Sequence, residues 1–181
     1  MVLTGFMGAG KSTLGARVAQ ELGWRFVDLD EEIVRAEQQS IADIFDTAGE
    51  ASFRKLENIA LTMALKQDRL VLALGGGALE TEANRRLLAD DPATLLLYLA
   101  APLEILIARC EQQAQLQPQA AHRPVLEKRE VLRERFLRRK PLYESAHWTI
   151  ETTAQEPDAI VQAVLARWRE HTSGASFVHN E

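Results

Sequence analysis

The nine residues GFMGAGKST at positions 5–13 decide the fold of this chain. They match the pattern G-x-x-x-x-G-K-[ST] through Gly5, Gly10, Lys11 and Ser12. The match follows a short apolar stretch and precedes an amphipathic one, which is the strand-to-helix context that a phosphate-binding loop requires. A glycine-rich turn that matches by chance is the alternative, and the agreement of pattern, strand and helix argues against it.

Such a loop binds a nucleotide triphosphate mainly through its backbone. Glycines let successive N–H groups converge on phosphate oxygens, and the following helix adds the positive end of its dipole. Lys11 is expected to reach the β and γ phosphates and Ser12 to ligate Mg²⁺. The chain has no Asn-Lys-x-Asp signature for guanine, so ATP is the expected nucleotide. The expected contacts of the loop with ATP are Gly8, Ala9, Gly10, Lys11, Ser12 and Thr13.

Away from the loop, short apolar runs alternate with helical patterns. This alternation predicts an α/β fold with three layers, in which helices cover both faces of a five-stranded parallel sheet. Most of the runs are continuously apolar, as in strands that are buried on both faces. Ligands of such folds bind at the carboxyl ends of the strands. The expected strands cover 1–5, 24–30, 69–75, 93–100 and 147–152.

Helices are expected where apolar residues recur at helical spacing or where a capping signal stands. Gly23 is a stop signal for the first helix, and Ser40 with Asp43 three residues later is a capping pair. Pro102 stands at a first-turn position of another helix, and Pro157 precedes the last one. The expected helices cover 11–22, a segment opened by Ser40, 50–66, 80–88, 102–111, 127–139 and 158–171.

Length and composition indicate one globular domain, expected over residues 1–171 and followed by a flexible tail at 172–181. The net charge of −5 favours neither nucleic acid nor an anionic membrane as a partner. No stretch is long and apolar enough for a membrane span or a signal peptide, so we expect a cytoplasmic protein. The single cysteine, Cys110, lies in an apolar helical run and is expected to be buried.

One segment departs from this regularity and from the overall charge. Residues 111–122 are rich in Gln and Ala, and we interpret about 111–124 as either a mobile lid or an inert loop. Between His122 and Tyr143, eight Lys or Arg residues stand against three Glu residues. This local cationic surface is a solvated helix face, a nucleic-acid surface or part of an anion site. The acidic overall charge and the lack of interleaved aromatic residues argue against nucleic acid.

Two acidic residues follow the second expected strand. In VDLD, Asp28 and Asp30 stand two positions apart, so in a strand they would share one face. Beside a magnesium triphosphate, one carboxylate can hold the metal through water and the other can orient an acceptor hydroxyl. The alternative is a pair that caps a helix.

Three consecutive glycines, Gly75, Gly76 and Gly77, end the third expected strand. A sharp turn explains one glycine, because glycine reaches positive φ freely. Three in a row indicate a ligand that lies against the backbone where a Cβ would collide with it. We expect Gly75 to serve the turn, and Gly76 and Gly77 to present N–H groups to a substrate.

Taken together, the motifs resemble those of the shikimate kinase family, from about Val2 to Leu165. They are GFMGAGKST, VDLD, SIADIF, GEASFR with Glu57, LGGG, Arg123 in HRPVL and Arg139 in RKPLY. The resemblance implies a P-loop kinase that transfers the γ-phosphoryl of ATP to the 3-hydroxyl of shikimate, in aromatic amino acid biosynthesis. It also implies Mg²⁺ as cofactor, and we expect a monomer.

The resemblance assigns further roles to single residues. Arg54 and Arg139 would grip the substrate carboxylate, because a planar guanidinium binds a carboxylate with two hydrogen bonds. Asp30 would bind the acceptor hydroxyl, and Glu57 would fix Arg54. The remaining implied roles are Asp28 on the water shell of Mg²⁺, Arg123 on the transferring phosphoryl group, Arg109 and the loop before Pro157 beside adenine, and Ile41, Phe45 and Phe53 either over the substrate ring or in the core.

Two alternatives and one departure remain. A gluconate-type or nucleotide-type kinase has the same fold, and a nucleotide-binding module without turnover would share the loop. A protein that had lost its catalytic activity would have no reason to keep all five of these residues: Lys11, Asp30, Arg54, Arg123 and Arg139. Gln38 stands where the family commonly has glycine, which we expect to alter only a turn.

Overall fold

The computed structural model describes residues 1–116, 129–153 and 155–175. A five-stranded parallel sheet lies at the centre, with the strand order β2-β3-β1-β4-β5. The predicted α/β class with a parallel five-stranded sheet is confirmed. The strands are β1 (Val2–Thr4), β2 (Arg25–Asp28), β3 (Leu70–Ala73), β4 (Leu96–Ala100) and β5 (Trp148–Glu151).

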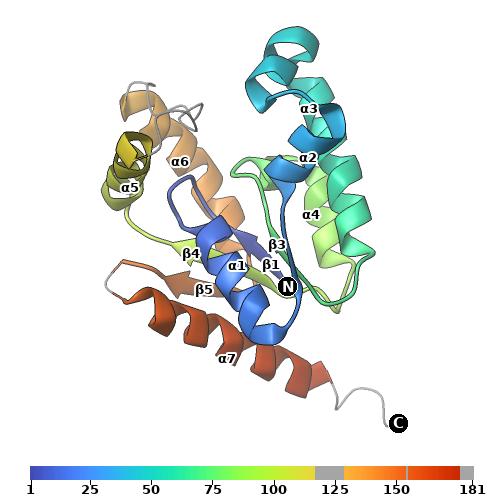
Figure 1. Cartoon of the computed structure of the whole chain (residues 1–181), viewed down its shortest axis with the longest axis vertical. Helices are drawn as coiled ribbons and strands as arrows, with labels where there is room; N and C mark the ends of the chain where they lie inside the picture. Colours follow the sequence, from blue (N-terminus) through green and yellow to red (C-terminus); the bar gives the residue numbers. More distant parts are fainter. Residues whose placement is uncertain (117–128, 154, 176–181) are drawn as a thin grey trace.

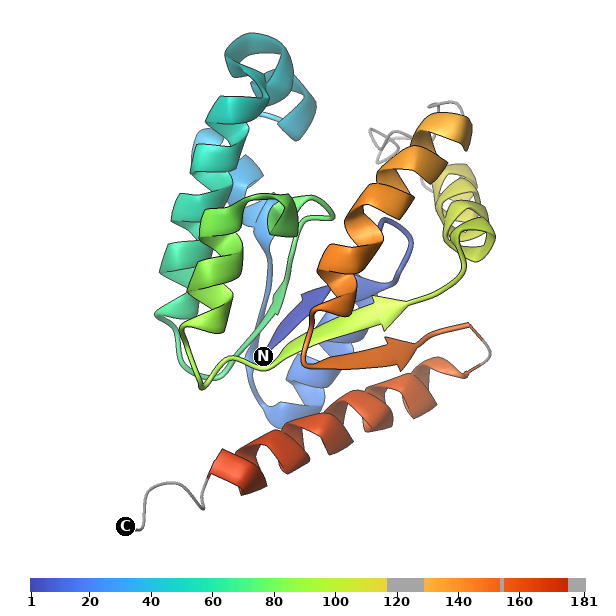
Figure 2. The same ribbon diagram turned by 180° about the vertical axis from the view of Figure 1, so that it is seen from behind.

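Helices form the outer layers on both faces of the sheet. α1 and α7 pack against each other over one face (Figure 1). The view from behind shows α4 and α6 over the other face (Figure 2). The helices are α1 (Lys11–Leu22), α2 (Leu29–Glu37), α3 (Ile41–Leu65), α4 (Glu82–Ala89), α5 (Leu103–Leu116), α6 (Arg129–Glu144) and α7 (Pro157–Ala175), with a short 3₁₀ helix, η1 (Ala78–Glu80).

The core follows from the strand order. The three central strands, β1, β3 and β4, are buried along their whole length, as their continuously apolar sequences predict. The two edge strands, β2 and β5, are partly exposed, so the prediction of full burial does not extend to them. Two aromatic pairs pack α6 against the sheet. The ring centroids of Phe136 and Phe6 lie 5.4 Å apart in an edge-to-face arrangement, and those of Tyr143 and Tyr98 lie 5.3 Å apart in a stacked one.

The capping signals in the sequence act as expected. Gly23 caps the end of α1 in the left-handed conformation. Ser40 and Asp43 form a reciprocal capping box at the start of α3. That helix continues through a break at Gly49, where φ is 80° and ψ is 165°, so two predicted segments form one kinked element.

Three expectations are corrected by the fold. The strand expected to reach residue 30 ends at Asp28, and the unpredicted helix α2 begins at Leu29. The helix expected to end at residue 111 continues to Leu116 as α5, into the predicted lid segment, and the helix expected to end at 171 continues to Ala175 as α7, into the predicted tail. The rest of both segments lies outside the described residues. Among the residues described, no helix is long and apolar enough to cross a membrane.

The strand order decides which segments meet at the functional end of the sheet. Because β2, β3 and β1 are neighbours and parallel, their carboxyl ends lie side by side. Asp28 ends β2, and Gly75 and Gly5 follow β3 and β1. Helices α2 and α3 stand on one side of the phosphate loop, and α5 and α6 stand on the other (Figures 1 and 2). Residues from both sides can therefore reach the same substrate.

Candidate active site

The phosphate loop runs from β1 into α1 in a conformation that needs its glycines. Gly8 and Gly10 have φ values of 74° and 87°, and Gly10 is the residue that precedes the helix. A Cβ on Gly8 would also collide with the Leu106 carbonyl oxygen of α5. The Nζ of Lys11 lies over the loop and donates to the carbonyl oxygens of Gly5 at 2.8 Å and Phe6 at 3.1 Å. The predicted phosphate contacts are thus gathered in one compact turn.

The two predicted metal residues are in direct contact. Ser12 Oγ donates to Asp28 Oδ2 at 2.5 Å. Asp28 is also the N-cap of α2, because its Oδ1 accepts from the backbone N–H of Asp30 at 3.1 Å. The capping alternative is confirmed for Asp28, and its position beside Ser12 leaves the predicted metal role open to the same side chain. A hydroxyl and a carboxylate at a helix N-terminus are the hard oxygen donors that suit Mg²⁺. Residues 1–116, 129–153 and 155–175 contain no group of three or more His, Cys, Asp or Glu side chains that could hold a metal ion.

Asp30 lies in the first turn of α2, so the argument that it shares a strand face with Asp28 is wrong. The structure nevertheless brings it to the glycine stretch. A Cβ on Gly75 would collide with Asp30 Oδ1, and none of the three glycines has a positive φ. Gly75 therefore makes room for Asp30. Its carbonyl oxygen also accepts from the Ala78 N–H at 3.1 Å, so Gly75 begins the expected turn, but without a positive φ. A Cβ on Gly76 would make ordinary van der Waals contact without a collision, since the nearest atom, Arg139 Nη1, lies 3.7 Å from the Cβ position.

Arg54 is held on α3 by acidic partners. Its Nη1 donates to both oxygens of Glu57, at 3.1 and 3.0 Å, and its Nη2 contacts Glu50 at 3.0 Å. The side chain of Glu57 is 1% exposed and also accepts from Asn84 Nδ2 at 3.3 Å. Burial raises the pKa of Glu57, although Arg54 acts in the opposite direction. The predicted fixing of Arg54 by Glu57 is present in the structure.

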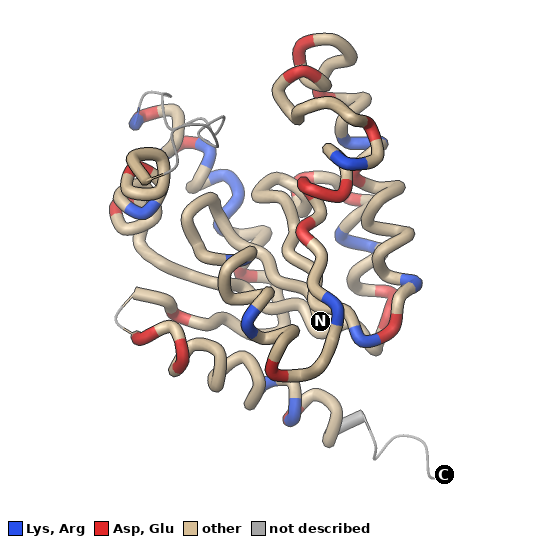
Figure 3. The backbone as a smooth tube through the Cα atoms, in the orientation of Figure 1, with Lys and Arg blue, Asp and Glu red and all other residues tan. Residues whose placement is uncertain are grey.

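Arg139 reaches the same place from α6, far along the chain from Arg54. A Cβ on Gly77 would lie 2.6 Å from Arg54 Nη2 and 2.9 Å from Arg139 Nη2. Gly77 thus permits two guanidinium groups to approach the backbone together. Lys and Arg (blue) recur along α6, and Asp and Glu (red) gather where α2 begins (Figure 3). The two predicted carboxylate-binding arginines converge on one glycine.

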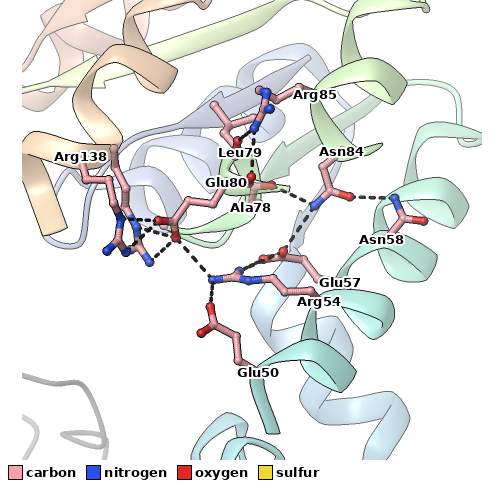
Figure 4. Close-up of polar contacts among 12 residues, drawn as sticks. Glu50, Arg54, Glu57, Asn58, Ala78, Leu79, Glu80, Asn84, Arg85 and Arg138 are labelled. Carbon is pink, nitrogen blue, oxygen red and sulfur yellow. Dashed lines mark hydrogen bonds and ion pairs between the residues drawn. The ribbon is translucent and has the colours of Figure 1, made fainter. Parts of the chain in front are cut away.

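Sequence reasoning missed three residues of this site. Glu80, at the end of η1, forms ion pairs with Arg54, Arg138 and Arg139, and lies between α3 and α6 (Figure 4). Asn84 joins Glu57 to the carbonyl oxygen of Ala78. Tyr143 donates to the carbonyl oxygen of Gly76 at 2.5 Å. No sequence motif predicts a role for these three residues, although Tyr143 belongs to the RKPLY stretch from which Arg139 was predicted.

The residues predicted for the adenine side are placed only in part. Arg109 of α5 donates from Nη1 to Thr152 Oγ1 at 3.0 Å and from Nη2 to the Thr152 carbonyl oxygen at 2.6 Å. Pro157 is the first residue of α7. Arg109 therefore lies beside the segment between β5 and α7, as its predicted role requires. Arg123 lies outside the described residues.

The three apolar residues proposed over the substrate ring divide between site and core. The rings of Phe45 and Phe53 lie 4.8 Å apart, with Phe53 in the buried core. Ile41 and Phe45 are only partly buried and pack against that core. Phe53 thus fits the core alternative, whereas Ile41 and Phe45 retain surface that a ligand can contact.

A family model described as shikimate kinase matches residues 7–169 of the chain. The chain belongs to the shikimate kinase family. It is accordingly a phosphotransferase with an alcohol acceptor. It is 38% identical over 168 residues to a shikimate kinase of Persephonella marina, and this match covers 92% of the chain and 97% of the relative.

Solved structures agree with this assignment. A shikimate kinase from Acinetobacter baumannii in complex with shikimate superimposes with a TM-score of 0.79 at 36% identity, covering 91% of this chain and 89% of that one. A gluconokinase from Sinorhizobium meliloti superimposes with a TM-score of 0.63 at 18% identity, covering 99% and 96%. The second likeness shows a shared fold alone. The expected rival of gluconate type therefore has the fold in common but a much weaker sequence match.

Proposed function

We propose that the chain transfers the γ-phosphoryl group of ATP to the 3-hydroxyl of shikimate, which yields ADP and shikimate 3-phosphate for aromatic amino acid biosynthesis. The observation that carries the proposal is the convergence of Asp30, Arg54 and Arg139 on the glycines after β3, next to the phosphate loop. An acceptor with one carboxylate and several hydroxyls matches this set of charges. The family membership supports the same substrate.

The nucleotide half of the site is the phosphate loop with its helix. Backbone N–H groups of the loop and the positive end of α1 offset the charge on the phosphates, and Lys11 leaves its carbonyl partners for the β and γ oxygens. Ser12 and Asp28 would hold Mg²⁺, Asp28 through water. When bound, Mg²⁺ neutralises charge on the triphosphate. The proposed nucleotide contacts are Gly8, Ala9, Gly10, Lys11, Ser12, Thr13, Arg109, Arg123 and Pro157.

The acceptor half holds shikimate at both ends. Arg54 and Arg139 bind its carboxylate, and the backbone of Gly76 and Gly77 lies along its ring. Asp30 accepts a hydrogen bond from the 3-hydroxyl and orients that oxygen toward the γ-phosphorus. In the transfer an O–P bond forms at that oxygen, the bond to the β-γ bridging oxygen breaks, and the hydroxyl proton passes to Asp30. We further propose that Arg123 contacts the transferring group.

The protein as a whole is proposed to act as a single domain and as a monomer in the cytoplasm, with no nucleic acid or membrane partner. Its net charge of −5 supports the absence of a nucleic acid or anionic membrane partner. Catalysis then consists mainly of positioning and charge neutralisation, because phosphoryl transfer requires little covalent chemistry from the protein.

The decisive experiment is a coupled assay that follows ADP. The protein is incubated with Mg-ATP and, separately, with shikimate, gluconate or AMP. We expect ADP release that depends on shikimate and little release with the other two acceptors. ADP release with gluconate or AMP alone would reassign the acceptor, and none with any acceptor would leave a nucleotide-binding module.

A further inference from the structure

Glu80 places an acid among the basic groups proposed to bind the substrate. Its Oε2 accepts from Arg139 Nε at 2.9 Å and lies 2.6 Å from Arg139 Nη2, and its Oε1 accepts from Arg138 Nε at 3.0 Å. Arg54 Nη2 lies 3.5 Å from Oε2. Figure 4 shows the carboxylate of Glu80 facing these guanidinium groups. One side chain of the protein therefore contacts both arginines of the proposed carboxylate site.

Two of the nitrogens that Glu80 contacts also face Gly77. They are Arg54 Nη2 and Arg139 Nη2, which lie 2.6 and 2.9 Å from the position of a Cβ on Gly77. Glu57, in contrast, contacts Arg54 through Nη1 and is buried, so it holds the arginine from behind. A guanidinium group has a fixed set of N–H donors, and donors turned toward one carboxylate are not free for another.

From these contacts we propose that Glu80 is a specificity-determining residue, a tethered carboxylate that occupies the Arg54 and Arg139 pair until an acceptor carboxylate displaces it. The inference rests on the proposed function, because it takes shikimate as the displacing anion. Glu80 keeps the two arginines paired in the empty site. It thereby lowers the affinity for the substrate and for other small anions alike.

The arginines do not depend on Glu80 alone for their positions. Arg54 keeps its two hydrogen bonds to Glu57. A Cβ on Gly76 would lie 3.7 Å from Arg139 Nη1, and Tyr143, four residues after Arg139 on α6, donates to the Gly76 carbonyl oxygen. Removing the charge of Glu80 therefore frees N–H donors and raises the local positive potential, while the guanidinium groups stay near Gly77.

The test compares Glu80→Gln with Glu82→Gln, which makes the same change two residues away. Glu82 is 64% exposed and pairs with Arg86, outside the proposed site. We expect Glu80→Gln to lower the KM for shikimate about five-fold, the scale of one partly exposed ion pair, with kcat and the KM for ATP unchanged. Glu82→Gln should leave all three constants at the wild-type values.

A second measurement separates displacement from a structural role. Calorimetric titration without ATP should show tighter binding of shikimate to Glu80→Gln, and equal binding of shikimate methyl ester, which has no carboxylate, to variant and wild type. An unchanged or raised KM for shikimate in a folded Glu80→Gln protein overturns the inference, as does a change for the ester. Failure of the proposed function looks different, because the wild type itself would then release no ADP with shikimate.

Discussion

Ser12 and Asp28 meet through a hydrogen bond of 2.5 Å, which joins the first turn of α1 to the N-cap of α2. The contact couples the phosphate loop to the helix that carries Asp30. A single carboxylate thus serves both as a helix cap and as the candidate partner of Mg²⁺. The two roles can be separated, because asparagine caps a helix as well as aspartate does but carries no charge.

Asp28→Asn should therefore keep the fold and weaken the use of the metal. We expect the Mg²⁺ concentration for half-maximal activity to rise at least about ten-fold, since the carboxylate proposed to hold the water shell of the metal is lost. The melting temperature without nucleotide should stay close to that of the wild type. A magnesium dependence equal to that of the wild type would remove Asp28 from the metal site.

The three glycines should respond differently to the same substitution. Gly75→Ala forces the Asp30 carboxylate aside, and a misplacement of that size can lower kcat about 100-fold. Gly77→Ala pushes Arg54 and Arg139 apart and should mainly raise the KM for shikimate. Gly76→Ala has space in the fold, so it should keep the melting temperature and affect only shikimate binding. Steady-state kinetics and thermal melts of all three variants test these three different effects. The same change in kcat, KM and melting temperature for all three variants would contradict the prediction.

Arg54→Lys keeps the positive charge beside the buried Glu57 but loses the planar fork. We expect the KM for shikimate to rise at least about ten-fold, with the KM for ATP nearly unchanged. Arg86→Lys is the matched control, because Arg86 is 72% exposed and pairs with Glu82 away from the site. An equal loss of affinity for both substrates would argue against the carboxylate role.

Gln38 ends α2 in a conformation that favours glycine, with φ at 53° and ψ at 30°. Gln38→Gly should therefore raise the free energy of unfolding by about 0.5–1 kcal/mol. The substitution relieves the strain of the left-handed conformation, and the greater conformational freedom of glycine in the unfolded chain offsets part of this gain. Gln39→Gly, at the next position and without a positive φ, should give no such gain. Urea denaturation of both variants measures the difference, and a loss of stability in Gln38→Gly would refute the explanation.

The ion pairs of Glu80 should stabilise the fold in a pH-dependent way. Partial burial acts to raise the pKa of Glu80, but hydrogen bonds and charge from Arg139 and then Arg138 outweigh it, so the pKa lies below its ordinary value of 4.5. The folded state then takes up this proton less readily than the unfolded state. Its contribution is fully present above pH 4.5 and is lost as the pH falls through the lowered pKa.

We accordingly expect the wild type to exceed Glu80→Gln in free energy of unfolding at neutral pH, and the difference to shrink as the pH falls toward about 3. Denaturation by urea across this range gives the two curves. A difference that stays constant or widens in acid would contradict the sign of the shift. Together with the kinetic test above, this measurement asks whether Glu80 stabilises the empty site while weakening substrate binding.

Much of the fold was predictable from local signals. The phosphate loop, the bounds of α1 and the capping box at Ser40 follow from glycine placement, helical spacing and side-chain caps, which act over a few residues. Helix α2 was missed because its first residues continue the apolar and acidic pattern of the preceding strand. The ends of α5 and α7 were set too early, since a Gln-rich or polar stretch can continue a helix that packing has already started.

By itself the sequence determined the phosphate loop, the alternation of strands and helices and the family motifs, because each depends on neighbouring residues and on residue type. Only the tertiary structure decided that Asp30 lies against Gly75, that Gly77 admits two arginines, and that Glu80 lies between them. Glu80 and Arg139 are 59 positions apart, and their contact exists because η1, which follows β3, packs against α6. Contacts of that kind depend on strand order and helix packing, which no local pattern specifies.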